Sequence, residues 1–512
     1  MTSIGDLLDI VVSRCRTNPA APALTQKGGR RLTYGELGRE LDSITAGLMR
    51  AGLQRGDAVV FSIRACPESI MLLLAIARCG GVVVAAEPGM SPRLFASRMS
   101  LLSPRWVMTE SLLYALARTR PVRSALERRG VKLPNLDIPG ARLLLLGPRL
   151  PWRPRALNYS DLLRGGPEIA PRTIAPDDQA AVVFTSGTTD APKGVVHSGA
   201  SIGAGIALIA EQLALDPADR VYSDQLHMVL PALMAGAEAV IPRLRRDVAS
   251  ELADLSAIRP THAYWVPSAL EQLLGAAGGG GRSLPASLKA VILGSAPAPA
   301  GFLRRSRDSV APSTRIYCAY AMTEMLPVSW ISLEEKLVYG GDGDVVGGPC
   351  RGVTVRIAAD GEVMVAGPNL CTGYLGQPPL TELPTGDVGR LEGGRLVLLG
   401  RKKDMIIRGS HNIYPALIEG VVASVPGVRR CALVGVYDER TADELVVLAL
   451  EAGDGVDPVE LRSRVSRELV EGANRIDVYA RPDRIVVTPI PVSGRSFKTD
   501  KPALRQLVSA LM

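Results

Sequence analysis

The chain contains 512 residues, of which 47% are hydrophobic and 21% charged, so it is long and apolar enough for more than one globular domain and is not a disordered protein. Its formal net charge is +8, but only 4% of its residues are aromatic and no helix-turn-helix, RNA-recognition or zinc-finger spacing occurs. Composition therefore argues against nucleic-acid binding, and a diffuse positive charge would instead attract small anions. The seven cysteines lack CxxC spacing, which argues against a disulfide framework and a structural zinc site.

The N-terminal segment, 1–20, has an acid-bearing amphipathic pattern and lacks the basic and then apolar order of a signal peptide. The longest apolar tract, 70–86, contains Arg78 and two glycines, which predicts a buried helix running into a strand. We therefore expect no membrane span and a cytoplasmic location.

Val-, Ile- and Leu-rich runs alternate with helix-like segments through the first two thirds of the chain, at 58–61, 81–86, 142–147, 180–184, 239–242 and 290–294. This alternation predicts an α/β fold with two subdomains built on largely parallel sheets. From about 340 to 402, short alternating strands and glycine turns predict a small, barrel-like antiparallel subdomain. Residues 403–512 predict a small α+β C-terminal domain, so the expected division is 1–402 and 403–512.

The stretch FTSGTTDAPKGVVH at 184–197 combines hydroxyls, glycines and one lysine after an apolar run, which predicts a loop between two buried strands. Its N–H groups, hydroxyls and the Lys193 ammonium could converge on one anion, and a polyphosphate is the commonest anion that needs so many donors. A Walker loop is excluded, because Pro192 stands where that motif needs glycine. An ordinary Ser/Thr/Gly turn is the alternative.

Three further stretches carry polar groups at places suited to ligands. Thr323 and Glu324, in YAMTE, follow an apolar strand and could meet a phosphate and its Mg²⁺, although a capped helix start is an alternative. Asp387, in TGD, could accept from ribose hydroxyls, although such turns are common. GRKKDMIIRGSHNIYPALIE (400–419) falls at the expected domain junction. Each motif is weak alone, and their order is the strong signal.

With these motifs in this order, the chain resembles the adenylate-forming superfamily, which includes acyl-CoA synthetases, luciferase-like enzymes and nonribosomal peptide synthetase adenylation domains. The resemblance extends over essentially the whole chain and includes LTYGEL (32–37), LLLAIARCGGVVVAAEP (72–88), TSGTTDAPKG (185–194), YAMTE, TGD and the 400–419 stretch. Asp190 and Ala321 stand where the family usually has glycine. The resemblance implies a large N-terminal part, a small mobile C-terminal domain, and ATP-dependent activation of a carboxylic acid as acyl-AMP with release of pyrophosphate.

The resemblance also implies roles for individual residues. The β- and γ-phosphates of ATP would be held by Thr185, Ser186, Gly187, Thr188, Thr189 and Lys193. Thr323 would contact the α-phosphate, and Glu324 would bind Mg²⁺. The adenine would be contacted by Gly294, Ser295, Ala296, Pro297 and Tyr320, and the ribose would be bound by Asp387 with Arg401. Lys403 would be the hinge of the C-terminal domain. A site of this kind needs fixed positive charge and donors where negative charge accumulates.

In the second half-reaction of the family, a thiol attacks the acyl adenylate. The implied acceptor is coenzyme A, or the phosphopantetheine of an acyl carrier protein as an alternative, and Gly409 would let the pantetheine pass close to the backbone. His227 would line the acyl site or be a core histidine. Asp224 lies near the place where peptide synthetases bind an α-amino group, but a non-amino acid is favoured.

The C-terminal stretch PVSGRSFKTDKPALR (491–505) departs from the Gly-Lys pair of the family. Matching on glycine selects Arg495, whereas matching on the following basic residue and leucine selects Lys498 as the lysine that reaches the reacting carboxylate and α-phosphate. We favour Lys498, because a compact ammonium bridges two oxygens in a tight site more readily than a planar guanidinium. The altered motifs leave open a noncatalytic nucleotide-binding paralogue, and net charge alone would favour a nucleic-acid binder.

Overall fold

The structure is a computed structural model that describes residues 2–511 except 87–91, 120–121, 123–135, 154, 166–173, 185–192, 245–246, 280–283, 299, 409–410, 439–442, 472–475, 477 and 494–497. Its contacts divide the chain into two compact units, which are described separately. Unit 1 consists of Met1–Tyr264, Ala321–Pro327 and Gly367–Thr381. Unit 2 consists of Trp265–Tyr320, Val328–Ala366 and Glu382–Met512.

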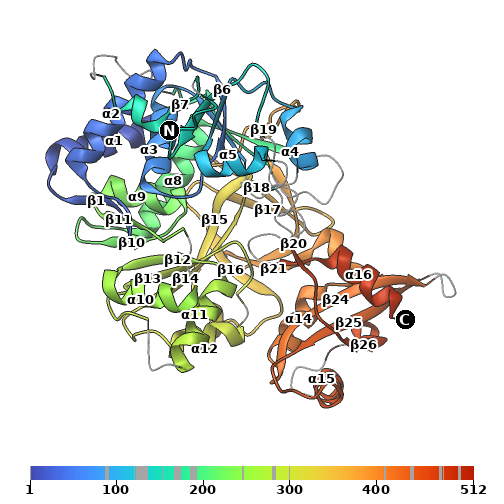
Figure 1. The fold of residues 1–512 in the computed structure, drawn as a ribbon. Helices are drawn as coiled ribbons and strands as arrows, with labels where there is room; N and C mark the ends of the chain where they lie inside the picture. Colours follow the sequence, from blue (N-terminus) through green and yellow to red (C-terminus); the bar gives the residue numbers. More distant parts are fainter. Residues whose placement is uncertain are drawn as a thin grey trace. The chain divides into compact units, whose positions relative to one another are not determined.

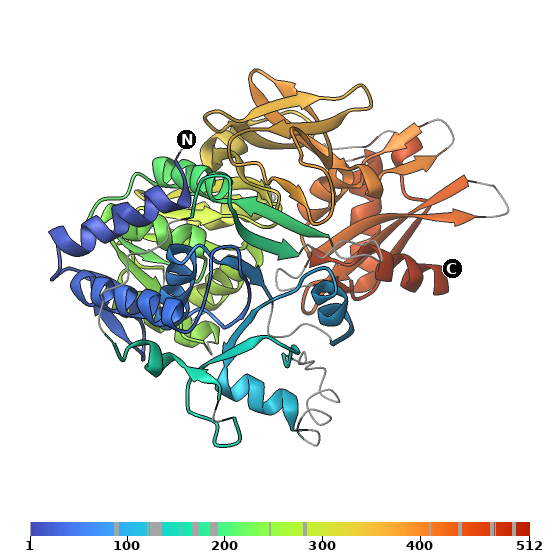
Figure 2. The same cartoon turned by 90° about the horizontal axis from the view of Figure 1, so that it is seen from above.

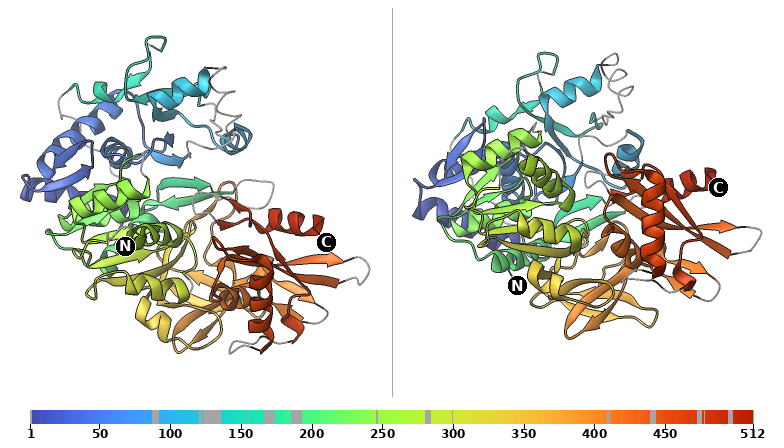
Figure 3. Two further views of the ribbon diagram at one scale, coloured as in Figure 1. Left: turned by 60° about the horizontal axis from the view of Figure 1, so that its bottom comes forward. Right: turned by 90° about the horizontal axis from the view of Figure 1, so that it is seen from below.

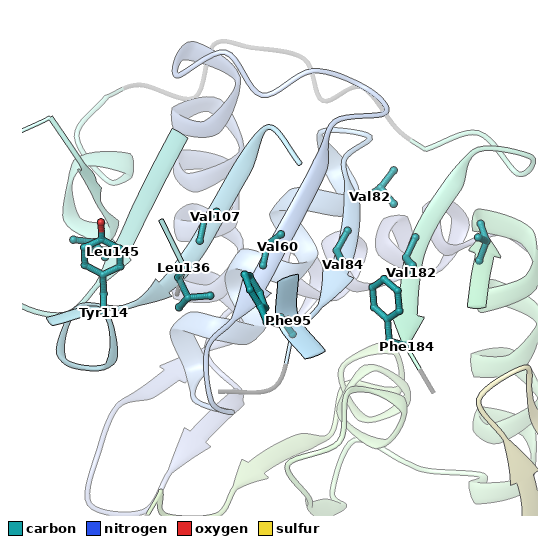
Figure 4. Close-up of a cluster of buried hydrophobic side chains, with 12 residues drawn as sticks. Val60, Val82, Val84, Phe95, Val107, Tyr114, Leu136, Leu145, Val182 and Phe184 are labelled. Atoms are coloured by element: carbon teal, nitrogen blue, oxygen red, sulfur yellow. The ribbon is translucent and has the colours of Figure 1, made fainter. Parts of the chain in front are cut away.

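Unit 1 contains an eight-stranded sheet whose spatial order is β19 (Gly373–Tyr374), β9 (Gly194–Ser198), β8 (Gln179–Phe184), β4 (Val82–Ala85), β3 (Ala58–Ser62), β5 (Trp106–Glu110), β6 (Arg142–Leu146) and β7 (Leu157–Asn158). The strands from β8 to β7 are parallel, and β9 and β19 add antiparallel pairs at one edge. Valines and aromatic side chains fill the core beside this sheet, including Val60, Val84 and Phe184 (Figure 4). Burial on both faces explains why these strands are continuous apolar runs.

One end of a 13-stranded sheet belongs to unit 1 and has the order β12 (His262–Trp265), β10 (Arg220–Tyr222), β11 (Glu238–Ile241), β1 (Pro22–Gln26) and β2 (Arg31–Thr33). It is parallel except for the β1–β2 pair. Its helices include α8 (Gly199–Leu213), α9 (Leu226–Ala235) and α10 (Val248–Ile258). Strands β3, β4, β6, β8 and β11 coincide with the apolar runs of the sequence, so the predicted α/β pattern is confirmed.

Helices α1 (Ile4–Thr17) and α2 (Tyr34–Arg50) pack side by side in unit 1 (Figures 1 and 2). The LTYGEL stretch starts α2: Thr33 accepts from the Glu36 N–H and the Glu36 carboxylate accepts from the Thr33 N–H, which satisfies two end groups of the helix. The hydroxyl of fully buried Tyr34 donates to the Ala237 carbonyl at 2.8 Å. The motif therefore has a structural role in starting and anchoring a helix.

Unit 2 contains strands in the order β17 (Thr354–Ile357), β18 (Glu362–Ala366), β20 (Leu383–Glu392), β21 (Arg395–Arg401), β16 (Asp344–Pro349), β15 (Met325–Ser332), β14 (Arg315–Met322) and β13 (Ala290–Leu293). Strands β16, β17, β18, β20 and β21 pair antiparallel, as the glycine-punctuated alternation predicts, while β13 and β14 pair in parallel. The helices on this part are α11 (Pro267–Gly279), α12 (Ala300–Asp308) and α13 (Leu333–Val338).

The C-terminal part of unit 2 is a three-stranded sheet of β24 (Val428–Asp438), β25 (Asp443–Ala452) and β26 (Arg484–Val487). Alternate residues of these strands face opposite sides: Leu433 and Leu448 pack in a core with α14 (Pro415–Ala423) and α15 (Pro458–Glu471), whereas Val434 and Val447 pack in a core with α16 (Lys501–Ala510). Figure 3 shows α15 and α16 (red) beside the β24–β25 hairpin (orange). The remaining strands are the pairs β22 (Ile406–Arg408) with β23 (His411–Ile413) and β27 (Val492–Ser493) with β28 (Lys498–Thr499).

Within the described residues, no helix combines the length and hydropathy needed to cross a membrane. The seven cysteines all lie in the described residues and form no disulfide bond, and Cys15, Cys66, Cys79, Cys318 and Cys371 are buried. The domain boundary between residues 402 and 403 and the cytoplasmic location stay predictions.

Candidate active site

Asp387 is the centre of a buried polar cluster in unit 2. It lies on β20 opposite Arg401 of β21, and Arg401 Nε is 2.7 Å from Asp387 Oδ1. The Tyr320 hydroxyl, at the end of β14, donates to Asp387 Oδ2 at 2.6 Å. Gly386 has a φ of +72°, which favours glycine at the residue before the carboxylate. Three predicted nucleoside residues, Tyr320, Asp387 and Arg401, are therefore brought together.

The negative charge of Asp387 is held at a cost. Its residue is only 5% exposed, and burial raises the pKa of its carboxyl, while Arg401 and the Tyr320 hydrogen bond lower it. Burial and the neighbouring Asp387 charge raise the pKa of Tyr320, so its hydroxyl keeps the proton that it donates. The direction for Asp387 shows that burial outweighs the favourable partners.

Lys498 lies within electrostatic range of this cluster. It belongs to β28, which pairs with β27 near the C-terminus. Loss of water around the ammonium and the Arg401 guanidinium lower the pKa of Lys498, whereas the Asp387 carboxylate raises it. Lys498 is an exposed residue, and the pKa of its ammonium responds to both charges of the ribose motif in unit 2. The competing residue, Arg495, lies outside the described residues.

The predicted adenine segment, 294–297, follows β13 and precedes α12. Ser295 has a φ of +68°, in the left-handed region that L side chains rarely adopt. Non-glycine residues in such conformations gather at binding sites, where the surrounding structure holds them. The main chain is fixed beside it, since the Gly294 N–H donates to the Trp265 carbonyl at 3.4 Å. The segment therefore has the local geometry of a ligand-contacting loop.

The hydroxyl-rich loop connects two paired strands of unit 1, as predicted. Phe184 ends β8 and pairs with Gly194, the first residue of antiparallel β9. The predicted phosphate-binding residues Thr185, Ser186, Gly187, Thr188 and Thr189 lie outside the described residues. Lys193 is described: it is exposed, and its Nζ lies 5.4 Å from the centre of the Tyr374 ring. This distance is that of a cation–π contact.

Thr323 and Glu324 form the turn between β14 and β15, so they follow a strand end as predicted and no helix starts there. Thr323 is exposed, and Glu324 is half-buried. Glu324 Oε1 accepts a hydrogen bond from the Tyr374 hydroxyl at 3.0 Å, and its main-chain carbonyl accepts from the Cys371 N–H at 2.8 Å. In the described part of the chain, the Glu324 carboxylate has no cationic partner, which leaves an anionic oxygen available to a ligand.

Two residues at this turn were not predicted from the sequence, Tyr374 and His197. His197 of β9 is 9% exposed; its Nε2 is 2.8 Å from the Thr323 carbonyl and its Nδ1 is 3.2 Å from the Ser201 hydroxyl. Burial lowers the pKa of His197, so a neutral ring donating from Nε2 to the carbonyl fits this geometry. His197 lies in the quoted 184–197 stretch, but nothing local distinguishes it from a core histidine.

His227, predicted to line the acyl site, lies on α9 with its ring edge-on to Tyr264 at 5.2 Å between ring centres. Burial lowers the pKa of His227 to about 4, although the Asp224 charge opposes this, so the imidazole is neutral at pH 7. Asp224 is exposed and accepts from the Gln225 side chain at 2.8 Å. An acyl-binding role for His227 stays a prediction.

Lys403 lies in a single 3₁₀ turn, Lys402–Asp404, directly after β21. A hollow of about 360 Å³ is lined by Gly386, Arg401, Lys402 and Lys403. The predicted hinge residue, Lys403, and the predicted ribose residue Arg401 therefore line the same hollow. Gly409 lies outside the described residues.

Comparison with known proteins places the chain in a family. Residues 11–375 match the model of the AMP-binding enzyme family, and residues 417–498 match that of the AMP-binding enzyme C-terminal domain. A feruloyl-CoA synthase from Amycolatopsis sp is 29% identical over 88% of this chain and 90% of its own. A 2-succinylbenzoate–CoA ligase from Bacillus cereus (strain Q1) is 25% identical over 83% of this chain and 84% of its own.

Among solved structures, the amide bond synthetase McbA from Marinactinospora thermotolerans superposes with a TM-score of 0.80 and 25% identity over 99% of both chains. The anthranilate CoA ligase AuaEII, in complex with anthranoyl-AMP, superposes with a TM-score of 0.82 at 18% identity over 99% of this chain and 98% of that one, which shows a shared fold.

The chain belongs to the AMP-binding enzyme family, whose model matches well over half of its length. It is an AMP-forming acid–thiol ligase, which activates a carboxylic acid as an acyl adenylate, releases pyrophosphate and passes the acyl group to a thiol.

Proposed function

We propose that the thiol is that of coenzyme A and that the acid is a non-amino, aromatic carboxylic acid. Relatives with 25–29% identity are named for CoA ligation of feruloyl and 2-succinylbenzoate groups, and another at 25% is named for medium-chain acyl groups. The observation that supports an aromatic acid in this chain is the neutral His227 ring set edge-on against Tyr264, since aromatic rings favour edge-to-face neighbours. Asp224 is exposed and already accepts a hydrogen bond from the Gln225 side chain, so its carboxylate does not need a substrate amino group as a partner.

For the nucleoside half of ATP, the proposed residues are those of unit 2. Asp387 would accept from the ribose hydroxyls, with Arg401 and Tyr320 fixing the orientation of its carboxylate. Gly294, Ser295, Ala296 and Pro297 would contact the adenine together with Tyr320. A charged acceptor makes stronger hydrogen bonds than a neutral one, so a buried aspartate would bind the ribose hydroxyls more tightly than a neutral side chain would.

For the phosphates, the proposed residues are Lys193, Thr323 and Glu324 of unit 1, with Thr185, Ser186, Gly187, Thr188 and Thr189 of the hydroxyl loop. The Lys193 ammonium and the Thr323 hydroxyl would bind phosphate oxygens, and both side chains belong to exposed residues. Placed donors of this kind stabilise negative charge as it builds up on the leaving pyrophosphate.

Mg²⁺ fits the donor set around Glu324. Mg²⁺ binds through one or two carboxylates together with substrate phosphates and water, and the described residues contain no cluster of three His, Cys, Asp or Glu side chains that would form a metal cage. A single half-buried carboxylate without a cationic partner meets this requirement. When bound, Mg²⁺ would neutralise phosphate charge, and Glu324 would be its protein ligand.

In the adenylation step, a substrate carboxylate oxygen bonds to the α-phosphorus and the bond from that phosphorus to pyrophosphate breaks. Lys498 would place its ammonium on the reacting carboxylate and the α-phosphate; its support is the electrostatic coupling to Asp387 and Arg401. Lys403 lies in the stretch 376–416 that separates the two matched family segments, which supports its role as the hinge. In the second step, the thiol sulfur attacks the acyl carbon and AMP leaves, with Gly409 beside the pantetheine.

The proposal is tested by a pyrophosphate-release screen over aryl, fatty and amino acids, with product analysis after addition of coenzyme A, phosphopantetheine or a simple amine. We expect pyrophosphate release with aryl acids and a thioester with coenzyme A. An amide from the amine, without a thioester, would favour the reaction named for McbA. A thioester only with phosphopantetheine would favour a carrier-protein partner, and no pyrophosphate with any acid would favour a noncatalytic nucleotide-binding protein.

A further inference from the structure

Tyr374 contacts two charged residues that come from different motifs of unit 1. Its hydroxyl donates to Glu324 Oε1 at 3.0 Å, and its ring face lies 5.4 Å from Lys193 Nζ. Lys193 ends the hydroxyl loop, Glu324 lies in the β14–β15 turn, and Tyr374 lies on the short strand β19. One aromatic side chain thus links the predicted phosphate lysine to the predicted metal carboxylate.

The backbone holds Tyr374 in register with Lys193. β19 pairs antiparallel with β9, so Tyr374 lies opposite Val195, two residues after Lys193. The Leu375 N–H donates to the Gly194 carbonyl at 2.8 Å, and the Thr372 hydroxyl donates to the Val196 carbonyl at 2.9 Å. The strand that carries Tyr374 is therefore fixed against β9, which begins directly after Lys193.

The same edge of the sheet also holds the Glu324 turn. The Cys371 N–H donates to the Glu324 carbonyl at 2.8 Å, and His197 of β9 contacts the Thr323 carbonyl at 2.8 Å. A phenol O–H donates and a carboxylate oxygen accepts, so the 3.0 Å contact is a hydrogen bond from the Tyr374 hydroxyl to Glu324 Oε1. Lys193, Tyr374 and Glu324 are thereby fixed on one scaffold.

Lys193 and Glu324 carry opposite charges, yet no ion pair joins them in the structure. A direct pair would place the ammonium on the carboxylate and compete with both proposed ligands, a phosphate for Lys193 and Mg²⁺ for Glu324. The Tyr374 ring gives the ammonium a weaker, neutral partner, and the hydroxyl occupies only one carboxylate oxygen.

We propose that Tyr374 is a positioning residue for adenylation: its hydroxyl orients Glu324, and its ring keeps Lys193 from pairing with that carboxylate. The phosphate-binding cation and the metal-binding anion then stay available in the nucleotide-free protein. This inference rests on the proposed roles of Lys193 and Glu324.

The two contacts can be removed separately in the full-length chain. Tyr374→Phe deletes the hydroxyl and keeps the ring, whereas Tyr374→Leu deletes both. Tyr339→Phe is a matched control, because the hydroxyl of half-buried Tyr339 donates to Glu392 Oε2 at 2.9 Å outside this site. The measurements are the dissociation constant of ATP by calorimetry without Mg²⁺, and the Mg²⁺ concentration that gives half-maximal pyrophosphate release with the best acid of the screen.

Tyr374→Phe should raise the half-maximal Mg²⁺ concentration about tenfold, as for a lost hydrogen bond to a charged group, and leave metal-free ATP affinity unchanged. Tyr374→Leu should in addition weaken metal-free ATP binding about fivefold, because Lys193 is free to pair with Glu324. Adding Glu324→Gln to Tyr374→Leu should restore the metal-free affinity, which loss of packing alone would not allow.

Wild-type behaviour in Tyr374→Phe would overturn the role of the hydroxyl. Failure of Glu324→Gln to restore ATP affinity in the Tyr374→Leu background would overturn the role of the ring. Failure of the proposed function would look different: the wild-type chain would bind ATP but release no pyrophosphate with any acid. The metal-free ATP-binding measurements would still test the role of the Tyr374 ring in that case.

Discussion

Replacing Asp387 by asparagine tests the assignment of the ribose site without emptying it. The amide has the same shape as the carboxylate; its oxygen can accept from Arg401 Nε and its NH₂ group can donate to the Tyr320 hydroxyl oxygen, so both contacts at 2.7 and 2.6 Å can persist. The substitution therefore removes mainly the negative charge that we expect the ribose hydroxyls to meet.

The expected loss follows from the number of hydrogen bonds. A hydrogen bond to a charged group contributes about 1.5–3 kcal/mol, against about 0.5–1.5 kcal/mol for a neutral pair. Two ribose hydroxyls that lose the charged acceptor should together lose about 2 kcal/mol, which corresponds to roughly 30-fold weaker binding at about 1.4 kcal/mol per factor of ten. Because ribose contacts are similar in the ground and transition states, KM for ATP should rise while kcat stays nearly constant.

Stability should change in the opposite direction. Burial raises the pKa of Asp387 in the folded state above 3.8, so the folded protein holds the Asp387 proton more tightly than the unfolded chain does. The contribution of this proton to the free energy of unfolding is complete below the unfolded pKa and is lost as pH rises through the folded pKa. At neutral pH the charged carboxylate therefore lowers the free energy of unfolding. We expect Asp387→Asn to melt at the same temperature as the wild type or higher at pH 7, and to lose this part of the acid dependence.

The assay is pyrophosphate release at varied ATP, paired with thermal melts from about pH 3 to about pH 8, a range that starts below the ordinary aspartate pKa of about 3.9. Asp254→Asn is the control, since it neutralises another buried aspartate that binds an arginine, with Arg243 Nε at 2.7 Å. The control should leave KM for ATP unchanged. A fall in kcat for Asp387→Asn with KM for ATP unchanged would refute the ribose assignment.

Three other substitutions have expected outcomes. Glu324→Gln should reduce Mg²⁺-dependent adenylation by about 100-fold or more with an unchanged melting temperature, since a charged ligand is lost and little packing changes; unchanged turnover at limiting Mg²⁺ would reject its role. Lys403→Pro should leave adenylation near normal and abolish thioester formation, because a fixed φ blocks rotation; equal loss of both steps would exclude a hinge. Lys498→Ala should abolish adenylation and spare thiolysis of a preformed acyl adenylate, and this split in Arg495→Ala alone would favour Arg495.

The order of strands and helices could be predicted from the sequence because it depends on local patterns. Apolar runs such as 58–61 and 180–184 become β3 and β8, since a strand buried on both faces needs a continuous apolar run. The resemblance motifs also predicted Asp387, Arg401 and Glu324 as neighbours of ligand, and the structure places the first two against each other at 2.7 Å.

The contacts that orient these residues could not be predicted in this way. Tyr374 and Glu324 are 50 residues apart in sequence, and His197 and Thr323 are 126 apart; both contacts exist because β19 and β9 pair beside the β14–β15 turn. Strand pairing and register depend on the whole sheet, and a single tyrosine or histidine has no local pattern that separates a positioning role from core packing. The sequence alone therefore determined the fold class, the family motifs and the reaction, whereas only the tertiary structure decided which side chains hold the motif residues in place, because hydrogen bonds between distant strands form only where their register brings donor and acceptor together.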